Sequence, residues 1–65
     1  MDLREFNNLD LIRQAERTWE EGILEGHWNR GNLHYVLYKL KSFFVEMAID
    51  INTEEVVHVK SFIYD

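Results

Sequence analysis

The stretch that decides the fold is Leu33–Tyr64, which reads LHYVLYKLKSFFVEMAIDINTEEVVHVKSFIY. Branched and aromatic residues gather in three runs, with polar turn formers between them, as is typical of strands. The runs predict strands over residues 33–39, 43–50 and 56–63. Apolar residues occupy both alternating sets of positions, so the predicted sheet has two apolar faces, and one helix can cover only one of them.

The part of the chain before this stretch has a helical period. Its apolar residues fall on one side of a helical wheel: Leu11, Ile12, Ala15, Trp19 and Ile23. They predict one amphipathic helix over about residues 9–25, with Asn8 as its N-cap and Gly26 just past its end. Gly22 and Gly26 lie within the apolar stripe, where we expect a bulky side chain of the sheet to pack closely against the helix.

Together these elements predict an α+β fold for a single domain over residues 1–65. One N-terminal helix packs on a three-stranded antiparallel β-meander, with residues 43–50 as the middle strand. A chain of this size buries only about 60% of the surface that its unfolded form exposes. It contains no cysteine, so disulfides and zinc–thiolate sites are excluded. A partner subunit is another way to add buried surface.

Loop lengths set the expected register of the sheet. A three-residue loop, Leu40–Ser42, places Leu37 opposite Val45, and a loop over residues 51–55 places Met47 opposite Val59. The second register also sets Glu46 across from Lys60, an opposite-charge pair that supports it. The face expected to pack on the helix then consists of Leu33, Tyr35, Leu37, Phe43, Val45, Met47, Ile49, Val57, Val59 and Ile63.

The opposite face of the predicted sheet keeps an apolar patch that no helix covers. Tyr38, Phe44 and Phe62 form a row across the strands, and Val36 lies in the next row. We predict these four residues as an interaction surface, through which, or through an edge strand, the chain forms a homodimer. Stacking of nucleic-acid bases on these aromatic residues is less favoured, because such surfaces carry surrounding Arg and Lys. For Trp28, we favour a position at the end of the core over a place in a contact surface.

The acidic side of the predicted helix supports an alternative function. Glu20, Glu21 and Glu25 would bind a basic protein partner, so that the chain acts as an adaptor or inhibitor. Either function is non-enzymatic.

Charge and composition exclude several classes of partner. The net charge is −5, and acidic residues outnumber basic ones in both halves of the chain. This balance argues against nucleic acid and against an anionic membrane surface. No apolar run approaches the roughly 20 residues of a membrane span, and the N-terminus lacks the pattern of a secretory signal. With no cysteine, the composition is typical of a cytoplasmic protein.

Residues with catalytic or metal-binding chemistry are sparse. Neither Ser42 nor Ser61 has an expected base and acid beside it, and no phosphate loop or dinucleotide motif is present. His34 and His58 are expected to flank Ala48 on the uncovered face, but one metal ion between them would need further ligands. We therefore predict no catalytic residue, no cofactor and no metal site.

Three short motifs within residues 36–62 carry a resemblance: Leu37-Tyr38-Lys39-Leu40, Phe43-Phe44-Val45-Glu46 and Ser61-Phe62. They resemble a group of short bacterial proteins of unknown function, whose pattern reads LYxL, FFVE or FYVE, and a strand ending in SF or TF. Those proteins have glycine or aspartate in the first turn, where this chain has Lys41-Ser42. The resemblance implies a bacterial protein with this hairpin, and it implies no site residue.

Overall fold

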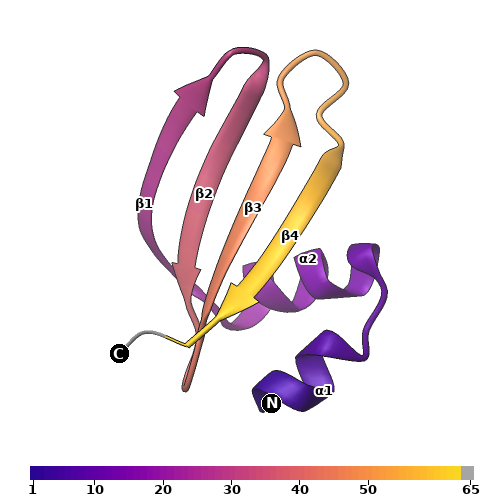
Figure 1. The fold of residues 1–65 in the computed structure, drawn as a ribbon, viewed down its shortest axis with the longest axis vertical. Helices are drawn as coiled ribbons and strands as arrows, with labels where there is room; N and C mark the ends of the chain where they lie inside the picture. Colours follow the sequence, from indigo (N-terminus) through magenta and orange to yellow (C-terminus); the bar gives the residue numbers. More distant parts are fainter. Residues whose placement is uncertain (64–65) are drawn as a thin grey trace.

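A computed structural model describes residues 1–63, so Tyr64 and Asp65 of the predicted domain lie outside the described part. Two helices come first, α1 (Leu3–Asn7) and α2 (Leu11–Glu21). Four strands follow: β1 (Ile23–Arg30), β2 (Leu33–Lys39), β3 (Phe44–Asp50) and β4 (Val56–Phe62). The strands form one antiparallel sheet in the order β1-β2-β3-β4, with both helices on one side of it (Figure 1). The α+β class is confirmed, but one helix and one strand more are present than predicted.

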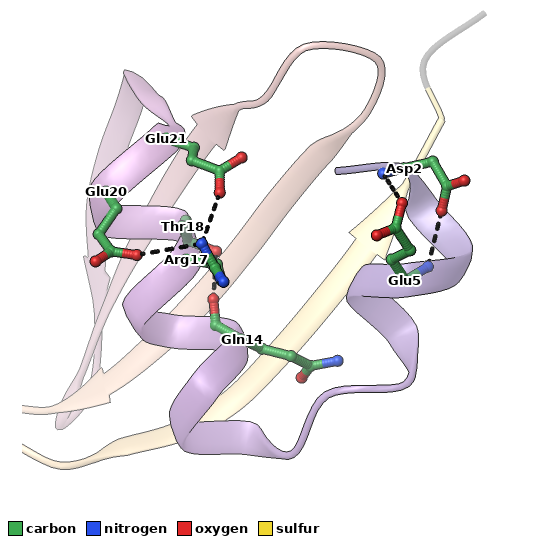
Figure 2. Close-up of polar contacts among 7 residues, drawn as sticks. All are labelled: Asp2, Glu5, Gln14, Arg17, Thr18, Glu20 and Glu21. Atoms are coloured by element: carbon green, nitrogen blue, oxygen red, sulfur yellow. Dashed lines mark hydrogen bonds and ion pairs between the residues drawn. The ribbon is translucent and has the colours of Figure 1, made fainter.

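The helical region is divided because two aspartates begin separate helices. Asp2 caps α1 in a capping box, in which its side chain accepts the backbone N–H of Glu5 and the Glu5 side chain accepts that of Asp2 (Figure 2). Asp10 caps α2 by accepting the backbone N–H of Arg13 at 2.9 Å. Asn8, the predicted N-cap, instead ends α1.

Gly22 ends α2 four residues before the predicted end of the helix. Its backbone is extended, with φ −86° and ψ 157°, and the chain continues directly into β1. A Cβ atom here would lie 2.6 Å from the carbonyl oxygen of Thr18 and 3.1 Å from the Tyr38 side chain. The expected close contact between a glycine and a sheet side chain therefore exists at Gly22. It does not exist at Gly26, which lies in β1 with nothing within 4 Å of its Cβ position.

The register of β3 with β4 is confirmed over most of its length. Glu46 lies opposite Lys60 and Met47 opposite Val59, as predicted. A bulge after Ala48 changes the end of the ladder, where Ile49 pairs with Val56 in place of Val57.

The predicted register of β2 with β3 is wrong by one residue. Leu37 lies opposite Glu46, and not opposite Val45. The cause is a shorter turn, because the backbone N–H of Leu40 donates to the carbonyl oxygen of Phe43 at 2.8 Å and only Lys41 and Ser42 remain at its tip. A shift by one residue exchanges the two faces of β2.

The core lies between the sheet and the helices. Its buried residues are Phe6, Ala15, Val36, Leu40, Phe43, Val45 and Met47. The ring centroids of Phe6 and Phe43 are 5.2 Å apart, so α1 packs against the turn between β2 and β3. Thr18 is also buried, with its hydroxyl donating to the carbonyl oxygen of Gln14 at 2.8 Å (Figure 2). Among residues 1–63, neither helix is long and apolar enough to cross a membrane.

We predict that Gly22→Ala destabilises the protein by about 1–3 kcal/mol, because the new methyl group meets the backbone of Thr18 and the ring of Tyr38. Urea unfolding measures the change. Gly26→Ala is the matched control, and we expect it to change the free energy of unfolding by less than about 0.5 kcal/mol, because its Cβ position is open. An equal loss in both variants would contradict the close contact at Gly22.

Candidate interaction surfaces

The face of the sheet opposite the helices, called the outer face below, is rich in apolar side chains. The strand pairings place eight of them there: Ile23, Trp28, Leu33, Tyr35, Leu37, Phe44, Ala48 and Phe62. Both helices lie on the other side of the sheet (Figure 1). Ala48 is only 1% exposed although it is not part of the core cluster, because larger neighbours such as Tyr35 and His58 flank it on the adjacent strands.

Two stacked aromatic pairs dominate the outer face. Trp28 of β1 stacks on Tyr35 of β2, with ring centroids 5.6 Å apart and planes inclined by 2°. Phe44 of β3 stacks on Phe62 of β4 at 5.7 Å and 16°. Each pair holds two large rings in fixed positions, which lowers the conformational entropy that a partner would have to remove. Trp28 remains 42% exposed.

The structure divides the predicted interaction surface between the two faces. Phe44 and Phe62 lie on the outer face, as expected. Val36 is 8% exposed and belongs to the core, and Tyr38 packs against that core. The expected row of Tyr38, Phe44 and Phe62 is therefore wrong. The error follows from the register of β2, which is shifted by one residue. The same shift moves Leu33, Tyr35 and Leu37 from the expected core to the outer face.

Trp28 was expected at the end of the core and is found on the outer face instead. It belongs to β1, a strand that sequence reasoning missed. A signal was present in the sequence, because Gly31-Asn32 is a pair of turn-forming residues, and Gly31 has a positive φ of 61° at the turn between β1 and β2. Arg30-Gly31-Asn32 is a hairpin turn with a strand on each side of it.

Only one of the two histidines expected beside Ala48 lies there. His58 is opposite Ala48 on the outer face, whereas His34 is opposite Ile49 on the inner face. His34 lies near His27, with ring centroids 5.4 Å apart, and its Nδ1 atom contacts the side-chain oxygen of Asn29. Within the described residues, no three side chains of His, Cys, Asp or Glu gather as metal ligands.

The charges of the outer face nearly balance, although the chain carries a net charge of −5. Arg30, Lys39 and Lys60 are on this face together with Glu46 and Asp50. Glu46 and Lys60 lie directly opposite one another on adjacent strands. Most of the acidic excess is therefore elsewhere on the molecule.

A second apolar surface lies along α2. Ala15 is the one residue of the predicted stripe that α2 buries, whereas Ile12 is 67% exposed and Trp19 is 50% exposed. These side chains border a groove of about 390 Å³ between α2 and the start of β4, called the α2 groove below. Its lining residues are Leu11, Ile12, Ala15, Glu16, Trp19, Glu55 and Val56.

The three acidic residues predicted as one face of the helix do not act as a unit. Glu20 and Glu21 both pair with Arg17, whose Nη1 atom lies 3.8 Å from Glu20 and 3.3 Å from Glu21 (Figure 2). Glu25 lies in β1 and not in α2. The charge that this face offers to a basic partner is thus partly neutralised by Arg17.

The comparisons with known proteins leave the function to be argued from these surfaces. No protein-family model matches the chain, and no significant match is found among curated proteins or solved structures. The resemblance to short bacterial proteins remains a prediction.

We predict that Val36→Thr destabilises the protein by about 1–3 kcal/mol, because it places a hydroxyl group in the core without a ready partner. Leu37→Thr, one residue along on the outer face, serves as the control, and its cost is expected to be below about 1 kcal/mol. Urea unfolding of both variants tests the register. The sequence-derived register predicts the opposite order, so a larger loss at Leu37 would contradict the structure.

Proposed function

We propose that this is a small non-enzymatic protein that self-associates through the outer face of its sheet. The observation that carries the proposal is an apolar sheet face with two stacked aromatic pairs and no helix over it. Exposed apolar patches of this kind mark interaction sites on soluble proteins.

The dimensions of the sheet indicate how strong the association is. Four strands about 4.8 Å apart, three with seven residues and β1 with eight, each residue rising about 3.3 Å, give a face of roughly 400 Å². A face-to-face dimer then buries about 900 Å² in total, below the ~1,200–2,000 Å² of stable complexes. We therefore expect a weak dimer that forms at micromolar or higher protein concentration.

Charge balance favours a second copy as the occupant of this face. Two molecules with a net charge of −5 repel one another, but they repel least where the local charges balance, as on the outer face. The pair of Glu46 and Lys60 also offers both signs of charge to a copy related by a two-fold axis.

Pairing through a sheet edge is less favoured. The helices contact β4 near one edge of the sheet. At the other edge, a bulge between Leu24 and Gly26 interrupts the regular pairing of β1. Bulges in edge strands hinder the addition of a further strand. The outer face therefore offers a more regular contact surface than either edge of the sheet.

Sedimentation velocity over a range from micromolar to millimolar protein tests the proposal. We expect the sedimentation coefficient of the unmodified chain to rise with concentration. Trp28→Glu places a charge on the outer face at a half-exposed position, and we expect it to weaken the dimer at least about tenfold, which is 1.4 kcal/mol.

Ile12→Glu is the matched control, because it adds the same charge to the α2 groove on the other side of the sheet. It should leave the association unchanged. A chain that stays monomeric up to millimolar concentration would refute the proposal, as would an equal effect of the two substitutions.

A further inference from the structure

The α2 groove is a second surface, separate from the outer face, and it has the features of a docking site. Its apolar side chains come from one side of α2, at positions 11, 12, 15 and 19, and Val56 of β4 lies opposite them. This spacing makes a continuous ridge on one helical face. Such a ridge normally packs against another element, but here Ile12 and Trp19 remain largely exposed.

The rim of the groove is acidic. Glu16 of α2 and Glu55 of the loop before β4 both line it. Neither arginine of α2 forms an ion pair with these carboxylates in the described structure, because Arg13 pairs with Asp10 and Arg17 pairs with Glu20 and Glu21, although both arginines border a shallow pocket beside Glu16. Within residues 1–63, the ion pairs of the structure thus leave the groove with an apolar floor and a negative rim.

This charge pattern indicates which kind of partner fits the α2 groove. A second copy of the chain would bring the same two carboxylates together, in a protein that already carries a net charge of −5. A segment with apolar residues flanked by Lys or Arg matches both the floor and the rim. The aliphatic stems of Lys and Arg can lie along the apolar surface while their cationic ends reach the carboxylates.

We propose that the α2 groove binds a cationic amphipathic helix of another protein. Ridges of apolar residues at helical spacing interdigitate with those of a second helix. Peptide helices that dock in this way insert side chains spaced three and four residues apart. The volume of about 390 Å³ is at the lower end of the ~300–1,000 Å³ range of ligand pockets, which suits a few side chains of one helical face.

The two tryptophans allow the groove to be observed separately from the outer face. Trp19 lines the groove, Trp28 lies on the outer face, and the chain contains no other tryptophan. Trp28→Phe leaves Trp19 as the only indole, and Trp19→Phe leaves Trp28. Fluorescence of the two variants therefore reports on each surface in turn.

The test is titration of the Trp28→Phe variant with a synthetic amphipathic helix of leucine and lysine. We expect a blue shift of Trp19 emission that saturates with peptide. An analogue with glutamate in place of every lysine should bind at least about tenfold more weakly. High salt should weaken binding of the lysine peptide, because the charged contacts at the rim are exposed to solvent and are screened by ions.

Variants of the groove complete the test. Ile12→Glu should abolish the response of Trp19, and circular dichroism should show an unchanged fold. Glu16→Gln combined with Glu55→Gln changes only exposed side chains. We expect the double substitution to weaken binding of the lysine peptide several-fold and to have little effect on binding of the glutamate analogue.

Three outcomes would overturn the proposal. Equal binding of the two peptides would remove the charge argument. A response of Trp28 in the Trp19→Phe variant, with binding retained in Ile12→Glu, would move the peptide to the outer face. A blue shift of Trp19 on raising the protein concentration alone would make a second copy the occupant of the groove.

Discussion

The two-residue turn between β2 and β3 is the constraint on which the rest of the structure depends. Leu40 and Phe43 close this turn with a backbone hydrogen bond, and both side chains are buried in the core. Their burial fixes the register of the two central strands. That register places Val36 in the core and leaves Tyr35 and Leu37 on the outer face. A turn longer by one residue would exchange these positions and form a different surface.

A second constraint sets how much of the sheet the helices cover. Gly22 lets the end of α2 lie against Tyr38, and the chain then enters β1 without a loop. The helices are short and pack near β4, at the end of the sheet that is distant from the two hairpin loops at the top of the view (Figure 1). Ala15 and Thr18 are the side chains that α2 buries fully. The bulkier apolar residues of α2 therefore remain exposed along one side of the helix, where they line the α2 groove.

These constraints explain which parts of the fold could be predicted from the sequence. The residues of β2 follow from their branched and aromatic composition and from polar boundaries, and the length of the loop over residues 51–55, supported by the Glu46–Lys60 pair, predicts the register of β3 with β4. No such pair joins β2 to β3, and apolar residues at both alternating positions fit either register. Of the four residues proposed for the surface, Phe44 and Phe62 were consequently assigned to the correct face of the sheet, and Val36 and Tyr38 to the wrong one.

The missed strand has a separate cause. Ile23 continues the helical spacing of Trp19, so the pattern extended the helix through the glycine that ends it. Nearly all residues of β1 are exposed, and an edge strand with little burial has a weak alternation signal. The close approach at Gly22 involves the nearby carbonyl oxygen of Thr18 and also the side chain of Tyr38, which is distant in the sequence.

Much of the surplus of apolar residues in this chain thus lies on two surfaces that differ in charge. The outer face holds both signs in near balance, which lowers the repulsion between identical molecules. The α2 groove has two carboxylates at its rim, which favours a cationic partner over a second copy. Because the sheet and its core separate the surfaces, occupation of one does not block the other. A dimer formed through its sheets would present two acidic grooves, and avidity would strengthen its binding to a partner with two basic helices.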